Sequence, residues 1–228
     1  MKRLTYPKKA ILTVIVALAG LSFFSSAEAN HRKGQLGISG SILSGFPSGN
    51  FSDLTNTGLG VGLELEYGIT NTFSAGFLFN YLPFQGPDII QDSTLSEEWL
   101  VKHYGLYAKL YFEPFNELVP YLKGGAMLTD YEADISRRYQ DDNDSTDAPL
   151  DTTISGNGKL TVMFGVGLKW DLYTRLSFSG EVLFTKFFDV VQDIQQVRQG
   201  VVIHDRHDVD AQYVSFNLLG TFYFGRKK

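Results

Sequence analysis

The sequence predicts an all-β fold, an eight-stranded antiparallel up-and-down transmembrane β-barrel. Two observations predict it. Polarity alternates residue by residue through segments of about ten residues, and long polar connections alternate with tight turns. The clearest example is Gly58–Tyr81, in which two alternating segments flank Gly68-Ile69-Thr70-Asn71. Side chains on a strand point to opposite faces with period two, so each segment has one apolar face and one face of small and ionic residues.

The two faces of this hairpin indicate which side meets lipid. Its large apolar residues share one face: Leu59, Val61, Leu63, Leu65, Tyr67, Phe73, Ala75, Phe77, Phe79 and Tyr81. They are too many and too large for the interior of a small barrel, whereas glycine, serine and the carboxylates of Glu64 and Glu66 fit inside it. Hydrocarbon offers the backbone no hydrogen-bond partners, so only helices and closed barrels span it. The aromatic rings are therefore expected to face lipid.

The other strands are expected from the same alternation. They are Gly34–Leu43, Trp99–Phe112, Val119–Tyr131, Gly158–Asp171, Arg175–Phe187 and Gln212–Phe224. The long connections are 44–57, 82–98, 130–156 and 188–211, and we expect all four to be loops on one side of the membrane. Both ends of the mature chain are then expected on the other side.

Aromatic residues near the strand ends predict two girdles at the membrane interfaces. The girdle toward the turns comprises Tyr67, Phe73, Phe112, Trp170, Phe222 and Phe224. The girdle toward the long loops comprises Tyr81, Phe84, Trp99, Tyr104 and Phe187.

The first 29 residues have the pattern of an export signal. Lys2, Arg3, Lys8 and Lys9 precede the uncharged run Ala10–Phe24, and Ala27-Glu28-Ala29 fits a small-x-small cleavage site. The alternative is a membrane-anchor helix, but the run is short compared with the roughly 20 residues that such a helix needs. We therefore expect a cleaved signal peptide, 1–29, and one barrel domain, 30–228.

Composition excludes several classes of function. The formal net charge is −5 and the predicted signal removes mainly basic residues, so an acidic mature chain is expected, which argues against nucleic acid as a partner. The chain has no cysteine, which excludes disulfides and thiol chemistry.

Three features resemble the small eight-stranded outer-membrane barrels of the OmpX, OmpA-domain and OmpW-like group. One is the signal peptide followed by alternating glycine-rich strands. Another is Phe46-Pro47-x-Gly49-x-Phe51-Ser52 with Leu63-Glu64-x-Glu66-Tyr67-Gly68-Ile69-Thr70 after it, and the last is Pro120-Tyr121-Leu122-x-Gly124-Gly125. The resemblance implies the bacterial outer membrane, with extracellular loops and periplasmic termini. It implies outer-membrane lipid and the barrel-assembly machinery as partners, together with an extracellular partner for the loops. In this group the machinery reads a terminal aromatic residue. Here Phe222-Tyr223-Phe224 matches, but Gly225-Arg226-Lys227-Lys228 follows.

Seven ionic side chains are expected inside the barrel, in the half nearer the turns. They are Glu64, Glu66, Lys109, Lys123, Lys169, Asp171 and Glu181. Isolated buried charges are costly, so we expect them to pair. A structural plug of salt bridges is one interpretation. A selectivity ring or proton path is the other.

An apolar set is expected above these charges. It comprises Leu78, Tyr107, Met127, Met163, Leu183 and Leu219. Packing inside the lumen accounts for it. The OmpW-like resemblance implies an alternative, an apolar throat for a small hydrophobic ligand.

Evidence for a metal site or for catalysis is weak. Asp141–Asp147 is dense in carboxylates but lacks the glycine and the terminal glutamate of a calcium loop. His204 and His207 form a weak metal pattern, and His103, with Ser96, Glu97 and Glu98 nearby, is expected to be a polar residue at the rim. We predict no cofactor, no metal and no catalytic residue.

Three hypotheses of function follow. The leading one is a non-enzymatic outer-membrane barrel with a polar, plugged lumen, which serves the envelope or binds partners through its loops. The alternatives are a narrow OmpW-like pore for small or hydrophobic molecules and, less favoured, a lipid-modifying enzyme at the rim.

Overall fold

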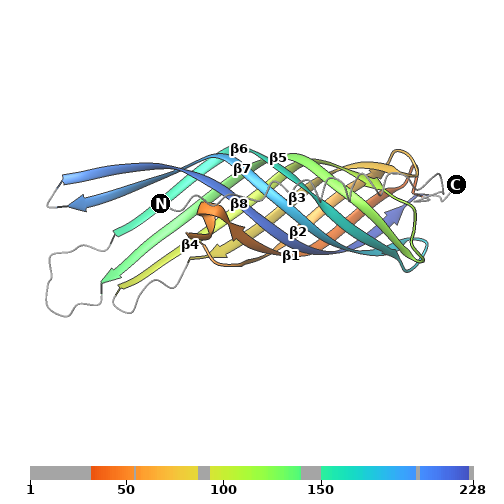
Figure 1. Cartoon of the computed structure of the whole chain (residues 1–228), viewed down its shortest axis with the longest axis horizontal. Helices are drawn as coiled ribbons and strands as arrows, with labels where there is room; N and C mark the ends of the chain where they lie inside the picture. The colour runs from red at the N-terminus through yellow and green to blue at the C-terminus, as the bar shows by residue number, and fades with distance from the viewer. Residues whose placement is uncertain (1–31, 54, 87–92, 140–149, 199–200, 226–228) are drawn as a thin grey trace, which may run out of the picture.

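The computed structural model describes residues 32–53, 55–86, 93–139, 150–198 and 201–225 (Figure 1). The predicted signal peptide, 1–29, lies outside these ranges. The strands are β1 (Leu36–Ser48), β2 (Gly58–Gly68), β3 (Phe73–Gln85), β4 (Ser93–Tyr111), β5 (Leu118–Tyr139), β6 (Leu150–Asp171), β7 (Leu176–Arg198) and β8 (Val201–Phe224). A short 3₁₀ helix, η2 (Gly49–Asp53), lies between β1 and β2. No helix among the described residues is long and apolar enough to cross a membrane.

The strands form one closed antiparallel barrel in the order β1 to β8, as the sequence predicts. Each strand pairs with its neighbours in the chain, and β1 closes the barrel by pairing with β8 from Leu36↔Phe224 to Ser48↔Gln212. Closure leaves no sheet edge in the wall, which is the condition for a β-sheet to span hydrocarbon. Figure 1 shows strongly tilted strands, with β8 ending at Phe224 on the side that carries the short turns. We call this the turn end and the opposite one the loop end.

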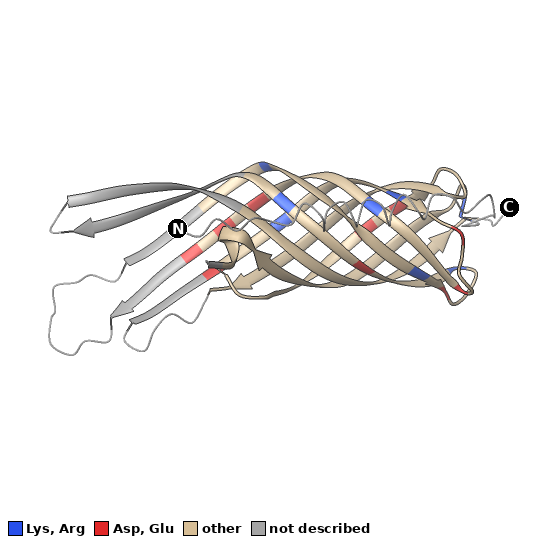
Figure 2. Cartoon of the chain, viewed as in Figure 1, with Lys and Arg blue, Asp and Glu red and all other residues tan. Residues whose placement is uncertain are grey.

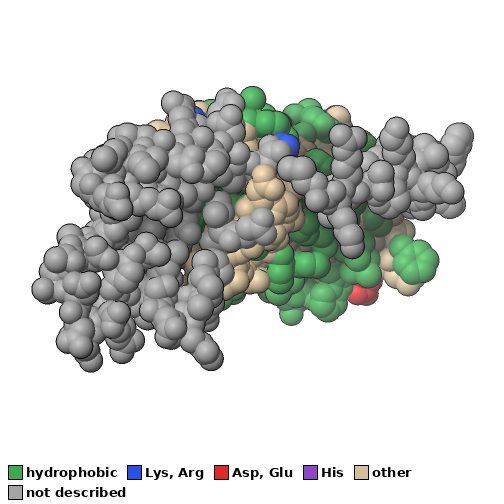
Figure 3. All heavy atoms as spheres, turned by 60° about the vertical axis from the view of Figure 1, so that its left-hand side comes forward, with side chains coloured by type: hydrophobic (Ala, Val, Ile, Leu, Met, Phe, Trp, Pro, Cys, Tyr) green, Lys and Arg blue, Asp and Glu red, His purple; other side chains and the backbone are tan. Residues whose placement is uncertain are grey.

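The two faces of the wall divide as the alternation predicts. Along β2 every second residue is buried and the residues between them are exposed. Leu59 and Leu63 point outward at 68% and 61% exposure, whereas Glu64 and Glu66 point inward at 3% and 2%. Hydrophobic side chains accordingly cover much of the outer wall seen in Figure 3. Apolar area facing water would be costly, so this surface is suited to lipid.

The four connections at the loop end are shorter than expected, because β1 and β3 to β8 continue beyond the predicted strands. The expected loop 188–211 was wrong. β7 and β8 pair as far as Arg198↔Val201, which makes most of this segment a hairpin. Most of the expected loop 130–156 is also strand, since β5 reaches Tyr139 and β6 begins at Leu150. Figure 1 shows these extensions projecting from one end of the barrel.

The closed barrel ends where β6 and β7 stop pairing, close to Thr161 and Phe187. Pairing of β6 with β7 begins at Thr161↔Phe187 and continues only toward the turn end. Register shifts occur close to this level, between Thr129 and Tyr131 in β5 and between Phe187 and Val190 in β7. Such bulges bend strands and strengthen their twist. Beyond them, β4–β5–β6 and β7–β8 leave the barrel as two separate ribbons (Figure 1).

The aromatic girdle expected near the loops is wrong for three of its members. Phe84, Trp99 and Phe187 are at most 1% exposed and pack inside the barrel, whereas Tyr81 is 38% exposed on the outside. The reason is period two. Phe84 shares parity with the inward Leu78 and Leu82, and Trp99 shares it with the inward Val101 and His103.

Candidate functional site

Five of the seven predicted ionic residues meet in one fully enclosed layer of the lumen, which we call the ionic layer. It consists of Glu64, Glu66, Lys109, Lys123 and Glu181, each at most 3% exposed. Their strands, β2, β4, β5 and β7, lie around the barrel, so the side chains converge from different walls. Salt bridges of 2.9 to 3.4 Å join Lys109 to all three glutamates and Lys123 to Glu181, and Lys123 also bonds Glu64.

The cross-strand register explains why the carboxylates are needed. Lys109 and Lys123 are directly opposite each other on β4 and β5. Like charges in such a pair repel, and here both ammonium groups are buried. Glu64 and Glu181 each bridge the two lysines, which replaces repulsion with attraction on both sides.

Tyrosine rings complete the ionic layer. The Tyr111 hydroxyl donates to Glu66 at 2.7 Å, and the Tyr121 hydroxyl donates to Glu181 at 2.7 Å. The ammonium of Lys123 also lies 4.7 Å from the centre of the Tyr107 ring, within the range of a cation–π contact. The sequence analysis missed the role of the tyrosines as donors, although their parity with Lys109 and Lys123 places them on the same face.

The other two predicted ionic residues lie nearer the turn end. Lys169 is buried, and its ammonium is 3.6 Å from Asp171. The side chain of Asp171 is 37% exposed, so it belongs to the rim and not to the enclosed lumen.

Arg32 also lies at the turn end, and the sequence analysis missed it because it precedes the first expected strand. Its guanidinium donates to Asp171 at 2.8 Å and to the Thr174 carbonyl at 2.6 Å, and it stacks 4.0 Å from the centre of the Tyr223 ring. It thereby joins the start of the barrel domain to the β6–β7 turn and to β8. The four acids and three lysines expected in the lumen left one negative charge in excess, and this imbalance was a signal for a further cation.

The apolar layer lies next to the ionic layer. Leu78, Tyr107, Met127, Met163 and Leu183 form one buried cluster. Leu219, the sixth predicted member, is also buried, but it pairs in register with Ser41 and Ser179, outside that cluster.

His103 was expected at the rim, but it lies deep inside the barrel. Its exposed fraction is 0%, its Nδ1 lies 2.6 Å from the Thr129 hydroxyl and its Nε2 lies 2.7 Å from the Tyr213 hydroxyl. Thr129 in turn bonds Thr161. Both ring nitrogens therefore have partners, which is what a buried imidazole requires.

An aromatic cluster fills the lumen at the loop end. Phe84, Trp99, Phe187 and Tyr213, from β3, β4, β7 and β8, form what we call the aromatic recess. Phe51 of η2 is inserted between them and is 0% exposed. In the sequence, Phe51 stands out only as part of a resemblance motif, and no local pattern places a loop residue inside the barrel.

The weak metal patterns lie mainly outside the described part of the chain. Residues 141–147 are not described. His204 and His207 lie on β8, but their side chains are not described. Among the side chains that are described, no group of three or more His, Asp or Glu is placed to hold a metal ion.

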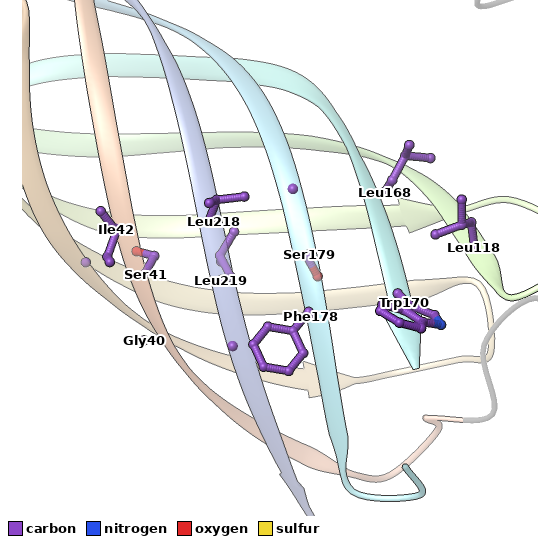
Figure 4. Close-up of a pocket in the computed structure, with 13 residues that line it drawn as sticks. Gly40, Ser41, Ile42, Leu118, Leu168, Trp170, Phe178, Ser179, Leu218 and Leu219 are labelled. Atoms are coloured by element: carbon purple, nitrogen blue, oxygen red, sulfur yellow. The ribbon is translucent and has the colours of Figure 1, made fainter. Parts of the chain in front are cut away.

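The outer wall has an apolar depression of about 750 Å³ near the closing seam (Figure 4). It lies where Gly40, Gly180 and Gly220 carry no side chains, among outward residues such as Ile42, Phe178 and Leu218. Its lining also includes Ser179 and Leu219, which are buried and face the lumen.

Comparison with known proteins agrees with this architecture. OprG from Pseudomonas aeruginosa has a similar fold, with a TM-score of 0.56 and 14% identity over 87% of this chain and 99% of that one. A major outer membrane protein from Thermus thermophilus has a TM-score of 0.50 and 12% identity, over 82% of this chain and 99% of that one. No curated protein sequence is significantly similar. Residues 15–222 match the family described as "Outer membrane protein beta-barrel domain". The chain therefore belongs to the outer membrane β-barrel domain family.

Proposed function

We propose that this outer-membrane barrel is a non-enzymatic, non-conducting scaffold that presents its projecting strands to partners outside the cell. The observation that carries the proposal is the packing of the lumen. The barrel holds, from the turn end to the loop end, the ionic layer, the apolar layer, the buried His103 group and the aromatic recess. An eight-stranded barrel has an interior just wide enough for side chains to fill, so four such layers in series leave no room for a water-filled path.

The charge pairing supports a structural role for the ionic layer. Each buried carboxylate of the layer contacts at least one lysine, and each of its two lysines contacts at least two carboxylates. A selectivity ring or proton path needs charges that face water and can exchange partners. These groups face each other at 3% exposure or less.

The strand extensions support a role outside the membrane. Only 11 residue pairs join β6 to β7, whereas β7 is 23 residues long and remains paired with β8 to its end. The extra residues extend the ribbon by roughly 35 Å at about 3.3 Å per residue. Acidic side chains, among them Glu98, Glu132 and Asp134, stand on the neighbouring ribbon near the loop end (Figure 2). We propose that this end is extracellular and that the turn end, with both termini of the mature chain, is periplasmic.

Planar-bilayer recording of the purified, folded protein tests the closed lumen. We expect no stable conductance steps from the wild-type chain, because the layers exclude water. Stable steps whose size changes in Lys109→Gln or Glu64→Gln would contradict the proposal and favour the narrow pore. For the outer role, replacing 190–209 by a two-residue turn should abolish partner binding by intact cells while the barrel still folds.

A further inference from the structure

Phe51 reaches the lumen from a segment outside the barrel strands. It sits in η2, five residues long, between β1 and β2, yet its side chain is completely buried. Phe46, a few residues earlier, points outward at 42% exposure and packs against Phe216. The chain therefore turns one phenylalanine toward lipid and the next into the mouth of the barrel.

The Phe51 ring has the contacts that an aromatic ligand would make. It meets the rings of Phe84, Trp99 and Phe187 at centroid distances of 5.2, 5.6 and 5.6 Å, with interplanar angles of 77°, 87° and 83°. These are edge-to-face arrangements, in which the positive edge of one ring meets the negative face of another. Three such contacts around one ring favour a π-system over an aliphatic group of the same size.

The walls of the aromatic recess belong to the barrel itself. They belong to four barrel strands, and they also contact one another: Tyr213 packs against Phe84 at 5.5 Å and against Phe187 at 6.4 Å. Below them, the His103 ring stacks on Tyr213 at 5.7 Å, and the Tyr213 hydroxyl bonds His103 Nε2. The recess is thus built by the barrel and filled from the loop.

The segment that carries Phe51 is held largely by short-range hydrogen bonds. The Thr55 amide and hydroxyl both donate to the Phe51 carbonyl, at 3.1 and 3.0 Å, and the Ser52 hydroxyl donates to the Gly49 carbonyl at 2.6 Å. Gly49 has φ +63°, a conformation that favours glycine and forms the turn into η2. Asn56, just beyond, ties the segment to the end of β3 through its amide, which donates to the Gln85 carbonyl at 2.6 Å.

We infer that the aromatic recess is a binding site for one uncharged monocyclic aromatic ring, and that Phe51 is its tethered occupant. The rings that meet Phe51 are those of Phe84, Trp99 and Phe187, which carry no charge, so the recess favours an uncharged ligand. A side chain on a short tether acts at a high effective concentration, so it competes with any free ring. Removing it leaves an apolar cavity of the kind that binds benzene-sized molecules.

Trp99 lines the recess and reports its occupancy. The chain has two tryptophans, so Trp170→Phe leaves Trp99 as the only emitter. In this background, toluene is titrated into the folded full-length protein and its Phe51→Ala variant. We expect a saturable change of Trp99 emission in the Phe51→Ala protein, with an apparent Kd about tenfold or more below that of the Phe51 protein. The apparent Kd of the Phe51→Leu protein for toluene should lie between these two values.

Two controls test whether the response depends on the recess and on an aromatic ring. Phe46→Ala removes an equal ring from the lipid-facing side, and its toluene response should match that of the Phe51 protein. Cyclohexane has a similar size but no π-face and should bind the Phe51→Ala protein several-fold more weakly than toluene. Equal responses of Phe51→Ala and Phe46→Ala, or equal affinity for the two probes, would overturn the inference. If Phe51→Ala does not fold, the comparison of Phe51→Leu with the Phe51 protein decides in the same way.

The inference stands apart from the closed-lumen proposal. The ionic and apolar layers lie below the recess, and none of the substituted residues belongs to either layer. A conducting wild-type barrel would overturn the proposed function and leave the recess unaffected. Failure of the Phe51→Ala protein to bind toluene would overturn the inference about the recess and leave the proposed function unaffected.

Discussion

Lys123→Met is expected to destabilise the barrel by about 3–5 kcal/mol, the cost typical of removing one partner from a buried salt bridge. The Lys123 side chain is 0% exposed and contacts both Glu64 and Glu181. Without it, Lys109 alone faces three buried carboxylates. Urea unfolding of the protein in lipid vesicles, followed by tryptophan emission, measures the loss.

The double variant Lys123→Met/Glu181→Gln is the matched control. It removes one charge of each sign, so the uncompensated carboxylate of the single variant is gone. We expect it to be more stable than Lys123→Met alone, a non-additive result that marks residues in one network. Wild-type stability in the single variant, or simple addition of the two losses, would show that the lysine is not essential to the packing of the lumen.

Gly167→Ala is expected to cost about 1–3 kcal/mol, the range for overpacking a filled interior. A Cβ at this position would overlap the ring of Tyr121, with Cε2 at 2.7 Å. The ring cannot move freely, because its hydroxyl donates to Glu181 at 2.7 Å. Gly167 is the cross-strand neighbour of both Tyr121 and Glu181, so the added methyl group disturbs the ionic layer directly. The measurement is the same urea midpoint.

Gly180→Ala is the control for this second prediction. Gly180 faces outward on β7, where the nearest atom to an added Cβ is Leu218 Cδ2 at 4.0 Å. We expect its unfolding midpoint to stay close to that of the wild type. Alanine is favoured over glycine within a strand, so equal losses in both variants would mean that the fit against Tyr121 does not set the cost.

Period two carried most of what the sequence could predict. It placed eight strands, closed the barrel and put Glu64, Lys109 and Lys123 in the lumen, because parity alone decides which face a side chain takes. It would also have placed Phe84, Trp99 and Phe187 inside, since each shares the parity of inward neighbours. The expectation of an interfacial girdle overrode that signal, and it was wrong.

Other features had no local signal. Arg32 and Phe51 enter the lumen from segments outside the strands, and only the closed barrel brings them to their partners. The long hairpins were taken for loops because polar strands surrounded by water need no apolar face, so their alternation is lost. The β4–β5 pairing continues in the register of the barrel wall, whereas β5–β6 and β7–β8 pair beyond a register shift that the sequence does not signal.

The central claim is that one face of each strand meets lipid while the other packs a closed lumen, and the two native tryptophans test it directly. Trp170 points outward at 43% exposure and Trp99 points inward at 0%. In vesicles of lipid brominated on the acyl chains, Trp170, measured in Trp99→Phe, should be strongly quenched. Trp99, measured in Trp170→Phe, should keep the emission it has in unbrominated lipid. Equal quenching of the two residues, or quenching of Trp99 alone, would contradict this assignment of the faces.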